Sequence, residues 1–275
     1  MNSSEETLKW PCTFYKFRNF DEEGYHLRLL THNEIFLSSP FLFNDPFDCR
    51  IPLRYDLEPK EKVVPWINED YVKKNSPELN EKAALFEAER LYEKKLLEDQ
   101  KNNQLIVENY IKKSLGVLSL SRSYSNLLLW SHYSNAHKGF CVGIDRRAFF
   151  YISRIYNENG YKIFIDKVDY PETNKFPIIM PLTMNGYERA KRQVLNKSKD
   201  WEYESEFRMV LVGNSNEVIT LPENAIRRVI IGCDVSPEDK DKLIEIIKAR
   251  KSKVHVYQAV KAPDEFKLHF KYLKL

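Results

Sequence analysis

A long helical run is the feature that most constrains the fold of this chain. From about Pro59 to Ser114 the sequence is rich in Glu, Lys and Leu, and its apolar residues recur at helical spacing, as at Leu85, Ala88 and Leu91. Glu–Lys pairs at the same spacing favour an exposed helix. Strand patterns occur before and after this run. We therefore predict a helical insertion at about residues 57–115, to which no chemistry is assigned.

The remainder alternates strand and helix patterns. Ser236 followed by Pro237 is typical of a helix start. Strands are predicted at residues 12–18, 34–38, 116–122, 140–145, 161–168, 217–221, 227–232, 253–259 and 266–275, and helices at 22–31, 126–137, 184–197 and 237–251. This order predicts an α+β fold, with a single mixed, mostly antiparallel sheet and flanking helices in one domain over residues 1–275.

Composition excludes several classes of protein. The formal net charge of +3 is too small to imply nucleic-acid binding by bulk charge. With 8 glycines the chain has no GxGxxG or GxxxxGK phosphate loop. The four cysteines form no CxxC pair, which argues against a zinc site and indicates reduced thiols in a cytoplasmic protein. No apolar run approaches the roughly 20 residues that span a bilayer, so no membrane partner is expected.

The stretch from Trp201 to Arg208 carries the densest charge pattern. As a strand it would place aromatic side chains on one face and the carboxylates of Glu202, Glu204 and Glu206 on the other. Such a face is most often the solvated side of an edge strand. The alternative is the wall of a site, in which Arg208 offsets part of the negative charge.

Polar pairs at the same alternation occur on three predicted strands. They are Lys16 with Arg18, Ser119 with Ser121, and Glu204 with Glu206. If these strands meet in one cleft, the site holds cations, hydroxyls and carboxylates. That set suits an anionic ligand containing a sugar, because a guanidinium clamps phosphate and a carboxylate stabilises positive charge at an anomeric carbon.

Other catalytic classes have weaker candidates. His132 and His137 are five residues apart, roughly 140° around a helix, so they cannot share one metal as an HExxH pair does. A hydrogen-bonded core histidine is the commoner outcome for His132. Ser119 and Ser121 are not in a nucleophile elbow. Cys141 lies in an apolar strand, where a thiol is inert.

Across nearly its whole length the chain resembles the bacterial family called domain of unknown function 2971. The residues that carry the resemblance are Tyr15-Lys16-Phe17-Arg18, Ser39-Pro40, Phe43 to Asp48, Leu118 to Ser121, Leu129 to Tyr133, His137 to Phe140, Trp201, and Glu204 to Arg208. The family name implies no activity. His132 and Tyr133 belong to the helix motif of this resemblance, and we add them to the candidate cofactor-binding residues.

A looser resemblance is to NAD-dependent ADP-ribosyltransferases of the Arg/Ser/Glu type. It implies that Arg18 holds the dinucleotide, that Ser119 supports the site and that Glu206 promotes loss of nicotinamide, with Glu204 on the acceptor side. The chain departs from that pattern in the long separation of Arg18 from Ser119, and in Leu120, where threonine is usual.

These observations predict an NAD-consuming ADP-ribosyltransferase or NAD glycohydrolase, acting as a bacterial toxin or defence effector. Its dinucleotide would be a substrate, its acceptor a nucleic acid or a protein, and no metal is predicted. One alternative is a binding or interaction protein without catalysis. A further alternative is a metal-dependent nuclease that uses Asp45, Asp48 and the Glu204/Glu206 pair.

Overall fold

The computed structural model describes residues 10–275, except for the side chains of residues 96–104, 106 and 107. The chain divides into two compact units. Unit 1 contains the residues up to Ser38, Leu115–Val168 and Asp200–Leu275, and unit 2 contains Ser39–Ser114 and Asp169–Lys199. The single domain expected from the sequence stays a prediction.

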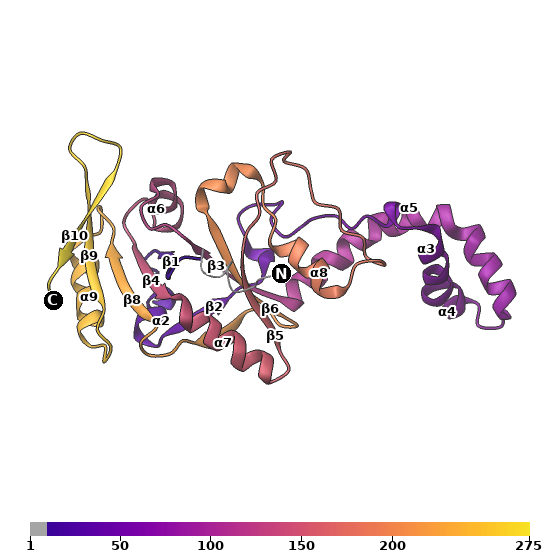
Figure 1. Cartoon of the computed structure of the whole chain (residues 1–275), viewed down its shortest axis with the longest axis horizontal. Helices are drawn as coiled ribbons and strands as arrows, with labels where there is room; N and C mark the ends of the chain where they lie inside the picture. Colours follow the sequence, from indigo (N-terminus) through magenta and orange to yellow (C-terminus); the bar gives the residue numbers. More distant parts are fainter. Residues whose placement is uncertain (1–9) are drawn as a thin grey trace. The chain divides into compact units, whose positions relative to one another are not determined.

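Unit 1 is built on one large mixed sheet (Figure 1). In the described part of the chain this sheet has eight strands in the order β10-β9-β8-β4-β1-β3-β6-β5. The strands are β1 (Thr13–Arg18), β3 (Leu115–Ser121), β4 (Phe140–Asp145), β5 (Lys162–Lys167), β6 (Glu206–Val212), β8 (Ile226–Ile231), β9 (His255–Lys261) and β10 (Leu268–Leu273). All neighbours are antiparallel except β8 and β9, which are parallel. The predicted α+β fold with a mixed, mostly antiparallel sheet is confirmed.

The two faces of this sheet differ in chemistry. One, the apolar face, carries residues such as Phe14, Leu118 and Met209, which belong to the largest hydrophobic cluster. It is covered by α7 (Arg146–Glu158) and α9 (Pro237–Lys248), whose buried side chains join that cluster. Because α9 connects the parallel strands β8 and β9, this part is a β-α-β unit.

The opposite side, the polar face, carries Tyr15, Ser121 and Glu206, with a smaller hydrophobic cluster beside them. Helix α6 (Leu127–Tyr133) packs Leu129 and Trp130 into that cluster. The side chain of Asn126 caps α6 by accepting from the N–H groups of Leu128 and Leu129.

The remaining elements of unit 1 are small. They are η1 (Tyr25–Leu27), α2 (Arg28–Thr31), and the antiparallel pair β2 (Glu34–Leu37) and β7 (Glu217–Thr220). Leu29, Leu30, Ile35 and Ile219 join the cluster on the apolar face. Helix α7 is absent from the sequence-based prediction, although Asp145 marks its start by accepting from the N–H of Arg147.

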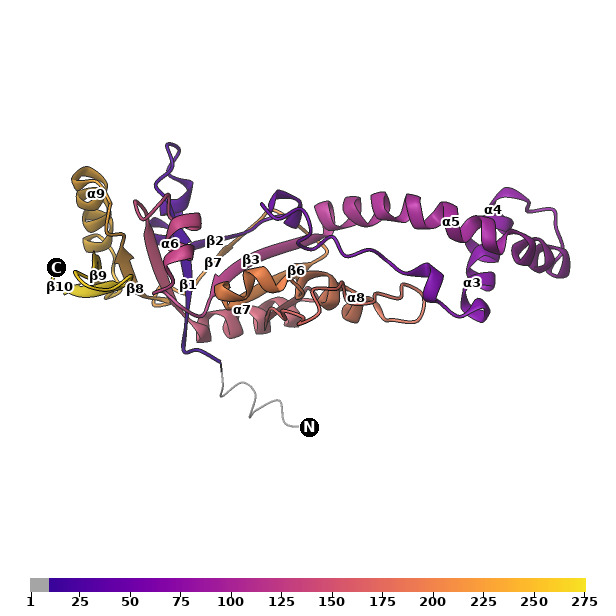
Figure 2. The same cartoon turned by 90° about the horizontal axis from the view of Figure 1, so that it is seen from above.

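Unit 2 is mostly helical, which confirms the helical character predicted for residues 57–115. It contains η2 (Pro40–Leu42), η3 (Tyr55–Leu57), α3 (Lys60–Ile67), the π-helix η4 (Asn68–Val72), α4 (Lys73–Asn75), α5 (Glu81–Ser114) and α8 (Gly186–Val194). Figure 2 shows α5 as one long helix beside α3 and α4. Val63, Val64, Ile67, Ala84 and Ala88 form the core between them. None of the described helices has the length and apolarity needed to cross a bilayer.

Candidate functional site

Strand register places a row of functional side chains across the polar face of unit 1. Tyr15 on β1 pairs with Ser121 on β3, and Ser121 pairs with Glu206 on β6. On the other side, Tyr15 pairs with Gly143 on β4, which pairs with Arg228 on β8. Directly paired residues project to the same side of a sheet, so this row brings a guanidinium, two hydroxyls and a carboxylate onto one face.

Gly143 allows the two bulky members of this row to meet. A Cβ atom at this position would lie 3.1 Å from both the Tyr15 ring and the Cβ of Arg228. Without it, Arg228 Nη1 donates to the hydroxyl of Tyr15 at 2.9 Å. Burial raises the pKa of Tyr15, while Arg228 acts in the opposite direction. Tyr15 is therefore a neutral phenol in the physiological range, held in place by Arg228.

Glu206 and Arg208 form a buried ion pair on β6. Nε and Nη2 of Arg208 donate to the two carboxylate oxygens of Glu206 at 2.7 and 3.0 Å. The exposed fractions of the two residues are 4% and 0%. This bidentate geometry confirms the prediction that Arg208 is the electrostatic partner of Glu206.

Glu204 is also buried, and it contacts helix α6. The hydroxyl of Tyr133, on α6, donates to Oε1 of Glu204 at 2.6 Å. Burial, followed by the charge of Glu204, raises the pKa of Tyr133, so this phenol keeps its proton. Ser121 Oγ donates to the backbone carbonyl of Glu204 at 2.7 Å, which ties the segment to β3.

Ser205 separates these two carboxylates with an unusual backbone conformation. Its φ of 45° lies in the left-handed region, which non-glycine residues adopt infrequently. Its N–H donates to the carbonyl of Glu202, and its own carbonyl accepts from the N–H of Arg122. This turn ends the 3₁₀-helix η5 (Lys199–Glu204) and begins β6.

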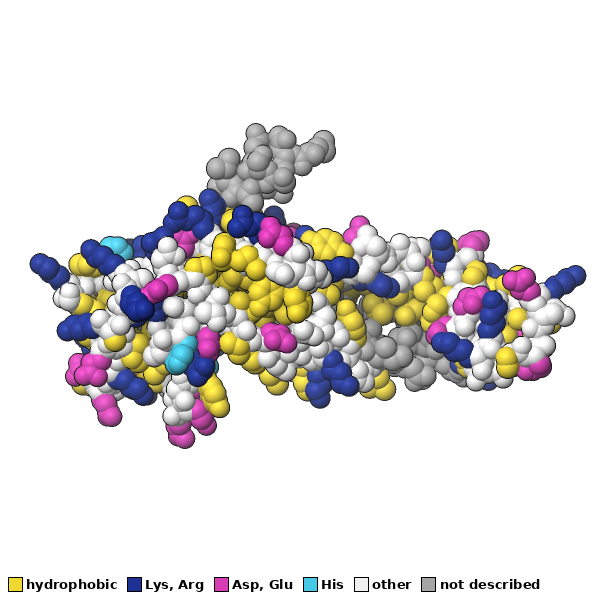
Figure 3. Space-filling model, turned by 90° about the horizontal axis from the view of Figure 1, so that it is seen from below, with side chains coloured by type: hydrophobic (Ala, Val, Ile, Leu, Met, Phe, Trp, Pro, Cys, Tyr) yellow, Lys and Arg dark blue, Asp and Glu magenta, His cyan; other side chains and the backbone are white. Residues whose placement is uncertain are grey.

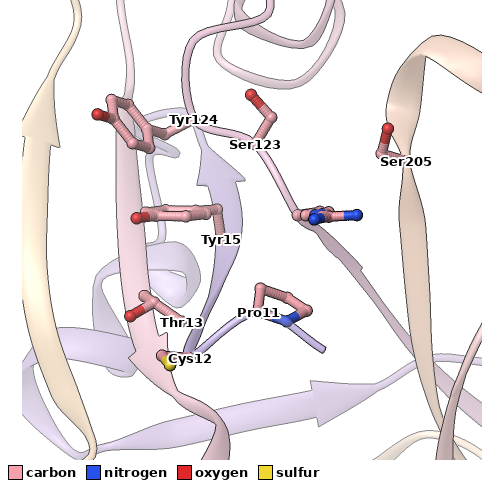
Figure 4. Close-up of a pocket in the computed structure, with 8 residues that line it drawn as sticks. Pro11, Cys12, Thr13, Tyr15, Ser123, Tyr124 and Ser205 are labelled. Carbon is pink, nitrogen blue, oxygen red and sulfur yellow. The ribbon is translucent and has the colours of Figure 1, made fainter. Parts of the chain in front are cut away.

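A pocket of about 430 Å³ opens beside Ser205. Figure 4 shows the side chains of Tyr15, Tyr124, Ser123 and Ser205 around it. Its lining residues are Pro11, Cys12, Thr13, Tyr15, Arg122, Ser123, Tyr124 and Ser205. The pocket is lined by the hydroxyl groups of Thr13, Ser123, Tyr124 and Ser205, besides that of Tyr15, and by the exposed guanidinium of Arg122. Its volume suits a small molecule.

Aromatic side chains gather next to Glu204, at the start of β6. The ring centroid of His132 lies 6.5 Å from those of Trp201 and Tyr203 and 6.3 Å from that of Tyr133. His132 is exposed on α6, so its interpretation as a core histidine is wrong. It belongs instead to a surface group of rings.

The first of the three predicted polar pairs lies on the other side of the sheet. Lys16 and Arg18 alternate with Tyr15 and therefore project from the apolar face, where Arg18 is directly opposite Phe140. Burial lowers the pKa of Arg18 to about 10, with Asp21 acting in the opposite direction. Lys16 Nζ donates to the backbone carbonyl of Ser119 at 2.8 Å. The shared face predicted for Arg18, Ser119 and Glu206 is therefore wrong as regards Arg18.

The second and third pairs partly fulfil the prediction. Ser119 and Ser121 lie on the polar face, where Ser119 pairs with Arg208 and Ser121 with Glu206. The predicted continuous strand from Trp201 to Arg208 is wrong, because residues up to Glu204 form a 3₁₀-helix. The solvated edge interpretation also fails, since β6 lies between β3 and β5 and the carboxylates of Glu204 and Glu206 are buried.

The sequence analysis missed the residues that line the pocket. Arg122 and Tyr124 follow the end of β3 in a loop, where no alternation marks them. In the sequence pattern Tyr15 shares one strand face with Phe17, and nothing in that pattern marks it as a ligand contact. Arg228 lies in a Val- and Ile-rich strand. The sequence around it does not indicate the contact with Tyr15.

Cys141 has the inert environment expected of it. It is fully buried, and burial raises the pKa of its thiol. Asp45 accepts from the N–H of Phe47 at 2.9 Å, so its carboxylate stabilises the turn that it begins. In the same unit, Asp48 lies 3.7 Å from Lys197 in a buried ion pair. Among the described residues, no group of three or more His, Cys, Asp and Glu could hold a metal ion.

Comparison with known proteins gives one match. Residues 129–209 match the model of a family described as "Protein of unknown function (DUF2971)". No curated protein and no solved structure matches the chain, so the resemblance to ADP-ribosyltransferases gains no support from them. The matched region begins in α6 and ends in β6, and it includes both Tyr133 and the carboxylates that flank Ser205. Over these residues the chain is similar to the DUF2971 family.

Proposed function

We propose that unit 1 binds NAD in the pocket beside Ser205 and cleaves its nicotinamide–ribose bond. The observation that carries this proposal is the composition of the pocket. Arg122 supplies an exposed guanidinium, and Thr13, Ser123 and Ser205 supply hydroxyls. A guanidinium binds phosphate oxygens in a bidentate manner, and hydroxyls bind ribose or phosphate. In this proposal Arg122 has the phosphate-binding role that was predicted for Arg18.

The aromatic wall of the pocket suits the remaining part of a dinucleotide. Tyr15 and Tyr124 have ring centroids 5.0 Å apart, and both line the pocket. Flat rings of this kind stack with nucleobases, whatever the base. The pocket therefore combines a contact for each part of the ligand: phosphate, sugar and base.

Glu204 is the carboxylate that we assign to the chemical step. Cleavage breaks the bond between the ribose anomeric carbon and nicotinamide, which leaves with the bonding electron pair. Water or an acceptor then forms the new bond to that carbon and gives up a proton. A carboxylate stabilises the positive charge that develops at the anomeric carbon. Glu204 directly precedes Ser205, which lines the pocket, and it accepts from the hydroxyl of Tyr133, which keeps its proton.

Nicotinamide release from NAD by the purified protein tests the proposal. We expect turnover by the wild type and by Glu202→Gln, because Glu202 is exposed in the same segment and serves as the matched control. We expect Glu204→Gln to lower the rate by about 100-fold, the scale of losing one electrostatic stabiliser of a transition state. Absence of release, by a wild type that is folded, would contradict cleavage.

A second candidate is nucleotide binding without cleavage. The observation that favours it is the burial of both carboxylates, which are exposed by 3% and 4% and engaged by Tyr133 and Arg208. Binding of NAD by calorimetry, together with no release of nicotinamide, would support this candidate over the first.

Several wider expectations belong to the same proposal. A nucleic-acid or protein acceptor, a cytoplasmic location and a role as a toxin or defence effector remain predictions from the sequence. The metal-dependent nuclease also stays a prediction, because Asp45 and Asp48 belong to unit 2 whereas Glu204 and Glu206 belong to unit 1.

A further inference from the structure

A connected group of aromatic rings lies on the polar face of the C-terminal strands. Tyr257 on β9 pairs with Tyr272 on β10, and Phe270 pairs with Ala259, so all of these side chains project from the same face. Arg228 on β8 pairs with His255 on β9. We call Tyr124, Arg228, His255, Tyr257, Phe270 and Tyr272 the aromatic platform.

Direct contacts hold the platform together. The guanidinium of Arg228 lies over the rings of Tyr124 and Tyr257, at 5.5 and 5.3 Å from their centroids. The Tyr257 and Tyr272 centroids are 5.6 Å apart, and those of Tyr124 and Phe270 are 4.8 Å apart. Arginine between aromatic rings is held in a fixed plane, so its charge is presented at a defined place.

Part of this surface is open. Helix α9 packs against the opposite face of β8 and β9, where Leu243 and Ile247 meet Val229 and Val256. On the platform side Tyr272 is 53% exposed, His255 is exposed, and Tyr124 and Tyr257 are half-buried. Packing against the smaller hydrophobic cluster explains why aromatic rings stand at Tyr124, Tyr257 and Phe270. It does not explain the exposed rings of His255 and Tyr272.

Positive charge is concentrated in the same segment. Residues 251–275 contain six lysines and two acidic residues, a formal charge of +4, whereas the whole chain carries +3. Figure 3 shows Lys and Arg side chains, with Asp and Glu side chains among them, on the part of unit 1 that holds these strands. Residues 251–275 are therefore more basic than the chain as a whole, with Lys261 paired to Asp234 and Lys267 to Glu265.

We propose that the aromatic platform binds single-stranded nucleic acid. Aromatic rings on an open sheet face stack with unpaired bases, and nearby cations neutralise the phosphates. A duplex keeps its bases stacked inside and offers the rings nothing to stack with. DNA and RNA share this chemistry. The proposal does not depend on cleavage of NAD, and Tyr124 belongs to both surfaces.

Fluorescence anisotropy of labelled oligonucleotides tests the proposal with the full-length protein and no NAD. We expect single-stranded DNA or RNA to bind at least tenfold more tightly than a duplex of the same length. Tyr257→Ala with Tyr272→Ala should weaken binding by about 20-fold or more, since each stacked base lost costs roughly 5-fold or more. Tyr257→Phe with Tyr272→Phe keeps the rings and should bind as the wild type does.

The control is a second pair of exposed tyrosines in unit 1. Tyr151 and Tyr161 are exposed by 48% and 50%, and Tyr151 is on α7, which packs on the apolar face. Tyr151→Ala with Tyr161→Ala should leave binding unchanged. Equal affinity for single strands and duplex, or loss of binding in the Phe variant, would overturn the proposal. Comparison of DNA with RNA shows which strand is preferred.

Discussion

The Glu206–Arg208 pair shows how one residue of the candidate site depends on another. Removing the guanidinium leaves a carboxylate in a position exposed by only 4%. We expect Arg208→Leu to lower the free energy of unfolding by about 3–5 kcal/mol, because the buried carboxylate then loses both hydrogen bonds from the guanidinium. Urea denaturation followed by circular dichroism measures the change.

Arg154 provides the control for that substitution. It lies 3.8 Å from Glu158 on the surface of α7, and its side chain is 67% exposed. Arg154→Leu should change the free energy of unfolding by no more than about 0.5 kcal/mol. Similar effects of the two substitutions would mean that the Glu206–Arg208 pair is not buried as described.

Asp145 makes the stability of unit 1 depend on pH. Hydrogen bonds from Arg147, its backbone N–H included, and from Arg227 lower the pKa of Asp145 from 3.8 to about 2. A lowered pKa stabilises the folded state above pH 3.8, and this contribution is lost as pH falls from 3.8 to about 2. We expect Asp145→Asn to cost about 1 kcal/mol at pH 7, allowing for solvent screening.

Urea titrations of the wild type and Asp145→Asn at several pH values check this expectation. The difference in unfolding free energy should stay constant from pH 7 to about pH 5 and shrink below pH 3.8. Asparagine keeps the acceptor that caps α7, so only the charge is tested. A difference that does not change with pH would contradict the assigned role of the charge.

The sequence predicts contacts between residues that are close along the chain, and it does not predict contacts between distant ones. Arg208 lies two residues from Glu206 on one strand, so the alternation pattern was enough to pair them. The contact of Arg228 with Tyr15 joins residues separated by 213 positions, and it depends on strand order and on the missing side chain of Gly143. No local pattern contains that information.

At the level of elements, the Trp201–Arg208 stretch shows where alternation misleads. Its side chains alternate as in a strand, yet the backbone turns at Ser205 with a φ of 45°. Hydrogen bonds to Glu202 and Arg122 hold that turn, and the second of these comes from the end of β3. Tertiary contacts therefore overrode a strand propensity.

The loop after β8 packs tightly against the segment that follows α6. A Cβ on Gly232 would lie 2.1 Å from the carbonyl oxygen of His137 and 2.7 Å from that of Gly139. We expect Gly232→Ala to destabilise the protein by about 3 kcal/mol or more, because backbone atoms must move to make room. Thermal unfolding by calorimetry measures this.

Gly186→Ala is the matched control. A Cβ there meets only the end of the Arg189 side chain, at 3.7 Å, and Gly186 is the first residue of α8. Alanine should stabilise this helix by up to about 1 kcal/mol. Destabilisation by both substitutions would show that the effect at Gly232 does not come from a steric clash of the added Cβ.

For the whole molecule, the sequence predicted the type of fold better than the site. Hydrophobic periodicity located most strands and helices and gave the mixed sheet, because each element buries one face. Helix α7 was missed, although Ala148, Phe149 and Ile152 give it an apolar side. Periodicity does not show which face of one strand lies on the same side of the sheet as a given face of another strand. For that reason the sequence did not show that Arg18 projects from the face opposite to Ser119 and Glu206.

The most direct test of the account is the affinity of the protein for NAD, measured by calorimetry for the wild type, Arg122→Gln and Arg18→Gln. If NAD binds in the pocket beside Ser205, Arg122→Gln should weaken binding by about 10- to 100-fold, the loss of a charge-assisted contact with phosphate. Arg18→Gln should bind as the wild type does, because Arg18 projects from the other face of the sheet. No binding by the wild type, or a loss on replacing Arg18 but not Arg122, would contradict the account.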